Sequence, residues 1–252
     1  MITEGAGERS ILMIHGWPDS HRIWDRMIET LKAEFRCLRF TLPGFHQSKP
    51  KRIYSVDEIL SVIRQVLDHV ALGDKVTLMG HDWGSYYGLR FIQKHQKYIE
   101  GFIGIDVGDI DSDEFHGKAV VYWGSIPYQF CLILAFFLPA PLGRWITWFV
   151  AKLAGAVHRR DLHQGMNYPY YQYHFQSHRS SLQDFIPDCP VLYLYGLRKP
   201  FQFHSSFWIS ALRNKSASRV EALNAGHWLN WTHAKECSAH VATWYKEAFP
   251  WK

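Results

Sequence analysis

Five consecutive residues, Gly80-His81-Asp82-Trp83-Gly84, place a carboxylate where it could act as a nucleophile. Residues 76–79 before them predict a buried strand, and residues 86–97 after them predict a helix. Glycine on either side lets a strand and a helix pass closely, so the central residue is held alone at the helix start in a strained backbone conformation. Aspartate in this position favours attack on a saturated carbon, which leaves an ester on the protein that water must cleave.

Two further motifs follow short strand-like runs. His15-Gly16-Trp17-Pro18 comes after the apolar residues 11–14, and Gly226-His227-Trp228 comes after residues 219–223, near the end of the chain. A neutral imidazole accepts a proton near pH 7, so His227 is the candidate base that activates the water. The order of the three motifs along the chain indicates a particular fold more specifically than any single motif does.

This order resembles the α/β-hydrolase fold and, within it, the epoxide hydrolase and haloalkane dehalogenase branch, whose nucleophile is aspartate. The segment Leu42-Pro43-Gly44-Phe45-His46-Gln47-Ser48-Lys49-Pro50 is similar to the loop after that family's next strand. The resemblance covers nearly the whole chain, with a looser match in the cap region. It implies catalytic residues Asp82 and His227 with an acid, an oxyanion hole from the backbone N–H groups of Trp17 and Trp83, and neither cofactor nor metal.

The acid that should orient His227 departs from the commoner family pattern. Many relatives carry aspartate in a Tyr-Gly-x-x-Asp context after the penultimate strand, but Lys199 stands at that position here. Some relatives, certain dehalogenases among them, place the acid after the strand that follows the elbow helix. That strand is predicted to end at Asp106, which we expect to be the acid because it directly follows the apolar run, with Asp109 as the alternative. If Asp106 and Asp109 only cap the first turn of the cap segment, His227 acts without a carboxylate partner.

Tyrosines in the predicted cap favour an epoxide over a haloalkane. In epoxide hydrolases, cap tyrosines donate hydrogen bonds to the oxygen of the opening ring, and Tyr128, Tyr168 and Tyr170 are the candidates. Dehalogenases hold a halide with indole or amide N–H groups, commonly including the tryptophan after the nucleophile, which here is Trp83. Epoxide opening is therefore the first hypothesis and dehalogenation the second. A non-catalytic ligand-binding or partner-binding relative is a third, suggested by Lys199.

Alternating strands and helices predict an α/β fold, with a mostly parallel sheet covered by helices on both faces. Residues 1–106 and 189–252 form the expected hydrolase core, and residues 107–188 form an inserted helical cap. A capping box of Ser55 and Glu58 begins one core helix. The family's N-terminal hairpin is expected to be missing, because residues 5–9 show no strand alternation. The sheet should then be shorter at that edge, which predicts self-association there or a truncated sequence.

Composition adds limits on the partners. The net charge of +5 is spread along the chain, and its densest spots, Lys49-Pro50-Lys51-Arg52 and Arg159-Arg160, come without the aromatic motifs of nucleic-acid readout. They are expected to be solvated surface, with a small apolar molecule as the substrate. The four cysteines are scattered and no signal peptide precedes them, which predicts reduced thiols and a cytoplasmic location.

The apolar residues 130–142 raise the question of a membrane. This uncharged run is shorter than the roughly 20 residues of a spanning helix, and two prolines lie near its end. A cap helix that roofs an apolar substrate pocket is the preferred interpretation. Shallow membrane association through a cluster of aromatic residues is the alternative; the cluster comprises Phe136, Phe137, Trp145, Trp148 and Phe149.

Overall fold

The computed structural model describes residues 1–47, 51–70, 75–176 and 182–250, so the end of the predicted loop at residues 42–50 lies outside the described residues. The core is a seven-stranded sheet in the order β1-β3-β2-β4-β5-β6-β7. Within the described ranges, β1 runs antiparallel to β3, and the other strand pairs are parallel. The strands are β1 (Ile2–Glu4), β2 (Arg9–Ile14), β3 (Phe35–Phe40), β4 (Val76–His81), β5 (Ile99–Ile105), β6 (Val191–Gly196) and β7 (Arg219–Leu223).

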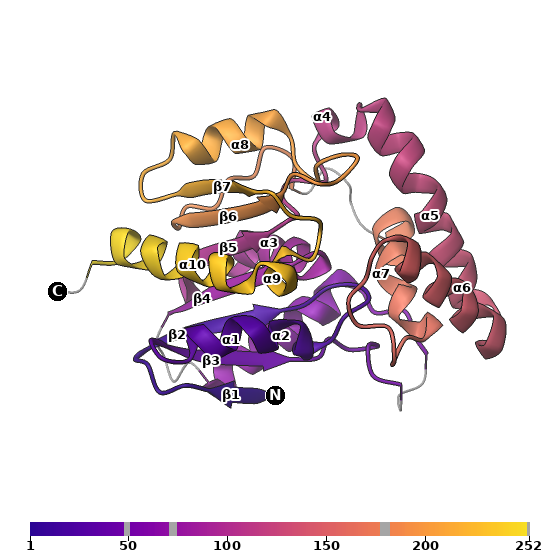
Figure 1. Cartoon of the computed structure of the whole chain (residues 1–252), viewed down its shortest axis with the longest axis horizontal. Helices are drawn as coiled ribbons and strands as arrows, with labels where there is room; N and C mark the ends of the chain where they lie inside the picture. Colours follow the sequence, from indigo (N-terminus) through magenta and orange to yellow (C-terminus); the bar gives the residue numbers. More distant parts are fainter. Residues whose placement is uncertain (48–50, 71–74, 177–181, 251–252) are drawn as a thin grey trace.

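Helices cover both faces of this sheet. On one face α1 (Asp25–Leu31), α9 (Leu229–Thr232) and α10 (Ala234–Ala248) pack together, while α2 (Val56–Val70) packs against α3 (Trp83–His95). In Figure 1, α10 lies in front of the sheet and α3 behind it, and α8 (Ser206–Arg213) lies beside β7. Every residue of β4 is buried, as expected for a parallel strand that is covered on both sides.

The first residues of the chain form a short strand that was not predicted. Ile2–Glu4 pairs with Cys37–Arg39 of β3, and Glu4 also forms an ion pair with Arg39 at 2.7 Å. The strand pairs with β3 and forms no hairpin with β2. It covers the β3 backbone that was expected to be bare, and a strand of three residues leaves little free edge of its own.

Each motif residue lies just beyond the carboxyl end of a parallel strand. Trp17 follows β2, Asp82 follows β4, Asp106 follows β5, Lys199 follows β6, and His227 follows β7. The chain order reverses between β2 and β4, which are neighbours in the sheet. Ligand sites in open α/β sheets form at such a reversal point, outside the carboxyl ends of the strands. The fold therefore brings these five residues together at the carboxyl ends of the parallel strands.

The segment between β5 and β6 contains only helical elements and loops among its described residues. These elements are α4 (Asp113–His116), α5 (Ala119–Phe137), α6 (Ala140–Leu153), the 3₁₀ turn η3 (Gln164–Asn167), α7 (Tyr168–Tyr171) and the π-helical turn η4 (Gln172–Gln176). In Figure 1, α5, α6 and α7 lie together on the right, beside one end of the sheet.

The apolar helix of this segment is longer than its sequence suggested. It begins at Ala119 rather than near residue 130, and of the helices in the described part of the chain it is the one long and apolar enough to cross a membrane. In the structure α5 instead packs against α6 and α7, and its side chains Val121 and Tyr128 line a cavity above Asp82.

Candidate active site

Asp82 occupies a strained turn between β4 and α3. Its backbone has φ 55° and ψ −126°, a conformation that non-glycine residues adopt at a cost and that clusters at functional sites. The helix begins at Trp83, three residues before the predicted start. A Cβ on Gly84 would lie 1.9 Å from the carbonyl oxygen of Ile14, so only glycine lets α3 approach β2 this closely.

The two carboxylate oxygens of Asp82 have different surroundings. Oδ1 accepts a hydrogen bond from the backbone N–H of Trp17 at 2.7 Å. A Cβ on Gly16 would lie 2.3 Å from Oδ1 and 2.5 Å from the backbone nitrogen of Trp83, so these three groups are immediate neighbours. Oδ2 lies 3.4 Å from Nε2 of His227. One oxygen therefore lies in a backbone N–H environment, and the other faces the candidate base.

His227 connects Asp82 to Asp106. Its Nδ1 lies 2.5 Å from Oδ2 of Asp106, whose side chain is fully buried. The other oxygen of Asp106 accepts hydrogen bonds from the backbone N–H of Gly196 at 2.9 Å and from Nζ of Lys199 at 2.5 Å. Asp106 also has a positive φ of 67°, a strained backbone that the sequence did not indicate. Lys199, at the family's usual acid position, thus contacts the predicted acid.

Asp109, the alternative acid, lies in another environment. Its carboxylate accepts hydrogen bonds from the backbone N–H of Ser205, at 2.7 Å, and from the hydroxyl of the same residue. Ser205 in turn is the N-cap of α8 and accepts a hydrogen bond from the N–H of Trp208. Asp109 therefore stabilises the start of α8, whereas Asp106 contacts the histidine.

The buried charges shift one another's proton affinity. Burial opposes a charge on His227, but hydrogen bonds to the carboxylates of Asp106 and Asp82 outweigh it and raise the pKa of the imidazole to about 9. Burial also opposes the charge on Asp106, yet Lys199 and His227 lower the pKa of that carboxyl below its usual value. Burial lowers the pKa of Lys199. With Asp82 ionised, the histidine is therefore held as the imidazolium.

Three supporting contacts were not predicted. Buried His81 lies with Nε2 3.0 Å from the carbonyl oxygen of His227, and burial lowers the pKa of its ring. The indole N–H of Trp228 donates to buried Asp19 at 2.8 Å, which joins the loop after β7 to the loop after β2. The indole N–H of Trp17 donates to Asn167 of the cap at 2.9 Å. His81 and Trp228 are each adjacent in the sequence to a predicted site residue, but the partners of their side chains become known only from the fold.

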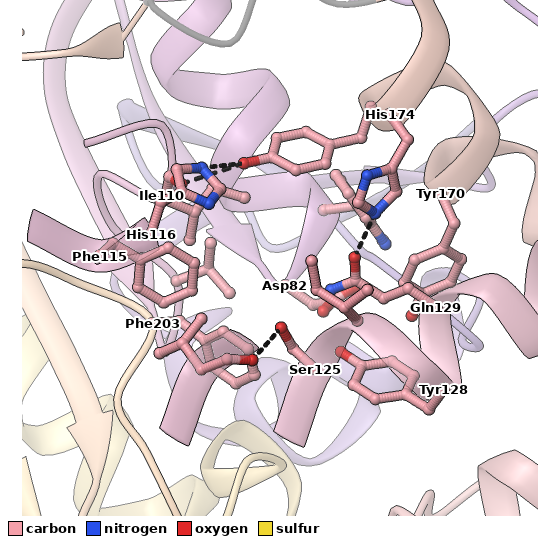
Figure 2. A pocket seen from close by; sticks show the side chains of 15 residues that line it. Asp82, Ile110, Phe115, His116, Ser125, Tyr128, Gln129, Tyr170, His174 and Phe203 are labelled. Carbon is pink, nitrogen blue, oxygen red and sulfur yellow. Dashed lines mark hydrogen bonds between the residues drawn. The ribbon is translucent and has the colours of Figure 1, made fainter. Parts of the chain in front are cut away.

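Asp82 lies where two cavities meet. The inner cavity, of about 60 Å³, lies under α4 and α5, and the outer one, of about 580 Å³, reaches His227 and the end of α6. Asp82, Tyr128, Tyr170 and Phe203 line both. Figure 2 shows Tyr128 and Tyr170 on one side of the inner cavity and Phe115 and Phe203 on the other. A substrate that reaches the nucleophile therefore has room on two sides of it.

The predicted cap tyrosines separate into two groups. Tyr128 and Tyr170 lie beside each other, with ring centroids 6.1 Å apart, and burial raises the pKa of Tyr128 to about 12. The pKa of Tyr170 is raised well above its usual value for the same reason, so both phenols keep their protons at neutral pH and remain donors. Tyr168 instead packs against Phe45 and Tyr54 and lines neither cavity.

The inner cavity also has polar walls that sequence reasoning missed. Gln129 Oε1 lies 2.6 Å from Nε2 of His174, and the hydroxyl of Tyr173 lies 3.1 Å from Nε2 of His116 (Figure 2). Gln129 and His116 come from the neighbouring helices α5 and α4, whereas Tyr173 and His174 come from η4, which follows much later in the sequence. A sequence signal existed for Gln129, which directly follows a candidate tyrosine, and for Tyr173, which lies close after Tyr170.

Comparison with known proteins gives the same family. The family model of the alpha/beta hydrolase fold matches residues 9–202. Epoxide hydrolase 1 of Caenorhabditis elegans is 29% identical over 106 residues, which are 40% of this chain and 26% of that protein. Soluble epoxide hydrolase of Corynebacterium sp. is 28% identical over 107 residues, or 42% and 37%. The matches thus span about a quarter to a third of these relatives' length.

Solved structures show the same fold over almost the whole chain. The epoxide hydrolase of Bacillus megaterium in complex with an inhibitor has a TM-score of 0.74 at 18% identity, and covers 97% of this chain and 95% of its own. A mutant of that enzyme, complexed with its product (R)-3-[1]naphthyloxy-propane-1,2-diol, has a TM-score of 0.71 at 19% identity, with the same coverage. With its strand order, its elbow and the family model that matches residues 9–202, the chain belongs to the α/β hydrolase fold family.

Proposed function

We propose that this hydrolase opens apolar epoxides through a covalent ester on Asp82. The observation that supports this most strongly is that Asp82, whose Oδ2 lies 3.4 Å from Nε2 of His227, lines the same two cavities as Tyr128 and Tyr170. It gives a carboxylate nucleophile, an imidazole and two neutral phenols around one point. Epoxide opening needs all three.

In the first half of the reaction, Oδ2 attacks a ring carbon, the C–O bond on that carbon breaks, and its electron pair stays on the ring oxygen. The phenols of Tyr128 and Tyr170 donate hydrogen bonds to this oxygen, and one of them transfers its proton and regains it from solvent. Water in the same site would compete poorly as a donor, because both phenols are already fixed by packing. The product of this half is a hydroxyalkyl ester of Asp82.

In the second half, water cleaves the ester. Forming the ester removes the negative charge of Asp82, which is one cause of the raised pKa of His227, so the imidazole gives up its proton more readily and becomes a base. It takes a proton from water, and the hydroxide adds to the ester carbonyl carbon. The N–H groups of Trp17 and Trp83 then stabilise the negative oxygen. The diol leaves, the carboxylate is restored, and the imidazolium is ready for the next cycle.

The shape of the site supports an asymmetric substrate. The outer cavity is roomy, with Val150, Leu153 and Phe201 among its lining residues, and the inner cavity is small and has polar walls. A large apolar substituent fits the outer side of the nucleophile and a small group fits the inner side. Aryl glycidyl ethers have this form, and the diol bound in the Bacillus megaterium mutant structure is the product that such an ether would give.

The decisive experiment is to trap the ester. The ester forms without the base but needs it for hydrolysis, so His227→Gln mixed with 1-naphthyl glycidyl ether should gain the mass of one epoxide on the peptide that contains Asp82. Asp82→Asn should show no adduct. Normal turnover by the His227→Gln protein, or an adduct on another residue, would contradict the mechanism.

Haloalkane dehalogenation is the second candidate, and one observation favours it. Trp83 lines the inner cavity, and its buried indole N–H lies beside the phenol of Tyr170, so it is a candidate halide donor. The indole of Trp17, however, already donates to Asn167. The epoxide therefore remains the better supported substrate.

Tyrosine substitutions separate the two reactions. Tyr128→Phe and Tyr170→Phe should each lower epoxide turnover by roughly 10²-fold or more, the usual contribution of a positioned proton donor, and leave halide release unchanged. Tyr168→Phe is the matched control, because this ring lies outside both cavities. Halide release from a haloalkane with no epoxide turnover in the unsubstituted protein would establish the dehalogenase instead.

A further inference from the structure

We propose that the outer face of α6 docks on an anionic lipid surface. Five large apolar side chains on this helix are between 38% and 72% exposed. We call them the α6 patch: Leu142, Trp145, Trp148, Phe149 and Leu153. Contiguous exposed apolar side chains of this size mark interaction sites on soluble domains, whereas single ones need no explanation.

The patch has the form of an interfacial helix. Its members recur at helical spacing, while Gly143, Thr147 and Ala151 on the opposite side are buried. The rings of Trp145 and Phe149 stack with centroids 5.6 Å apart. A helix with Trp, Phe and Leu on its exposed side lies in the plane of the headgroups and buries that side in the acyl boundary.

The charges around the patch indicate which surface it fits. Residues 140–160, which comprise α6 and the loop after it, contain four basic side chains and no aspartate or glutamate; the basic residues are Arg144, Lys152, Arg159 and Arg160. Nζ of Lys152 lies 5.1 Å from the ring of Trp148, so the cation is next to the aromatic face. Anionic lipid headgroups complement this arrangement. A second copy would bring two positive faces together, which argues against a dimer through the patch.

The patch also leads to the active site. Leu153, at the end of α6, lines the outer cavity together with Val150 and Ala154. With the helix on a bilayer, the mouth of that cavity lies at the lipid surface. This part rests on the proposed function: an apolar epoxide dissolved in the bilayer would reach Asp82 without crossing water.

Vesicle flotation of the full chain tests the docking without any substrate. The protein should float with vesicles that contain phosphatidylglycerol, bind weakly to phosphatidylcholine alone, and bind less as salt rises. The double variant Trp145→Ser/Phe149→Ser should lower the partition coefficient at least about tenfold, because two large apolar side chains no longer enter the membrane. Neither residue lines either cavity, so activity on a water-soluble epoxide should be unchanged.

Phe207→Ser is the matched control. Phe207 is 49% exposed, between the values of Phe149 and Trp145, but lies on α8, away from α6 in Figure 1. This variant should float like the unsubstituted protein. Because flotation needs no turnover, docking and the proposed function can fail separately.

Three results would overturn the docking proposal. The first is a protein that does not float, or whose flotation the double variant leaves unchanged. The second is a dimer, seen by light scattering without lipid, that the double variant dissociates, since the patch would then join two copies. The third is vesicle binding that survives alkaline extraction, because that would mean that α5 spans the bilayer.

Discussion

At the scale of single residues, Asp106 is shared between a base and a cation. One oxygen contacts His227 and the other contacts Lys199 and the N–H of Gly196. Asp106→Asn keeps the shape but loses the charge that stabilises the imidazolium and fixes its tautomer. We expect kcat to fall by roughly 10⁴-fold, as it does when the acid of a serine-protease triad is made neutral. Steady-state kinetics would check this, with Asp109→Asn expected to change kcat little.

Lys199 offers a rescue experiment for that variant. It occupies the family's usual acid position and reaches Asp106 directly, so a carboxylate at residue 199 should approach the same imidazole. Adding Lys199→Asp to the Asp106→Asn protein should restore a measurable part of kcat, while adding Lys199→Asn should not. No difference between these double variants would show that the two positions do not serve one geometric role.

The proton affinity of His227 should depend on the charge of Asp82. The pKa of the imidazole is raised to about 9, and the Asp82 carboxylate is one of its causes. In Asp82→Asn, which imitates the neutral ester, this pKa should fall by roughly 1–3 pH units, the usual effect of losing a neighbouring opposite charge. NMR titration of His227 would measure it. Asp109→Asn should leave the pKa of His227 unchanged. If Asp82→Asn also leaves this pKa unchanged, the loss of the Asp82 charge on ester formation cannot be what turns His227 into a base.

The raised pKa of His227 makes the stability of the fold depend on pH, and the direction of this dependence can be worked out. Because the folded-state pKa of His227 lies above the unfolded value of 6.5, its protonation stabilises the fold fully below pH 6.5, and this contribution is lost as the pH rises through 9. The imidazolium that Asp106 and Asp82 stabilise therefore also contributes to folding under neutral conditions.

At the scale of elements, the elbow depends on close backbone contact. Gly84→Ala would place a methyl group 1.9 Å from the carbonyl oxygen of Ile14, where neither β2 nor α3 can move without breaking its own hydrogen bonds. We expect the free energy of unfolding to drop by about 3 kcal/mol or more, at the upper end of overpacking effects. Chemical denaturation would measure it. Gly226→Ala is the control, since its nearest atom would be 3.9 Å away and its effect should stay within about 0.5 kcal/mol.

Local signals predicted the core elements well. β2, β4, β5 and β7 lie close to the predicted strands. The capping box is confirmed as well: the N–H of Glu58 donates to the hydroxyl of Ser55 at 3.2 Å, and the N–H of Ser55 donates to the Glu58 carboxylate at 2.8 Å. Buried strands and capping boxes are short-range patterns that need no tertiary information. The three-residue β1 could not be predicted, because it is too short to show alternation.

In the predicted cap, short-range sequence patterns do not determine which side chains face the cavity. Tyr168 and Tyr170 are two residues apart, about 200° around a helix, so when one faces the cavity the other faces away. The sequence contains both and cannot give the rotation of the helix. Likewise, Asp106 and Asp109 follow the same strand, and only the position of β7 decides which one His227 reaches. The sequence therefore predicted which types of residue the candidate site contains. It could not predict which tyrosine faces the cavity or which aspartate contacts His227.

At the scale of the whole molecule, the site joins the two parts of the chain. Asp82, Asp106 and His227 follow strands of the core, while Tyr128 and Tyr170 come from cap helices. The indole of Trp17 donates to Asn167, which also donates to Thr147 of α6 at 2.8 Å. A change in how α6 sits, for example on a bilayer, would therefore reach the loop whose N–H contacts Oδ1 of Asp82.

The position of β7 has a consequence for how the enzyme loses activity. Among the residues that the structure describes, this strand lies at the edge of the sheet and pairs only with β6, and of its five residues only Leu223 is buried. Edge elements open locally at lower free energy than the buried centre of a fold. Such an opening would separate His227 from Asp106 while the central strands stay intact. Along a urea gradient, we therefore expect turnover to disappear before the circular dichroism signal does, and coincident curves would show that β7 opens only with the rest of the sheet.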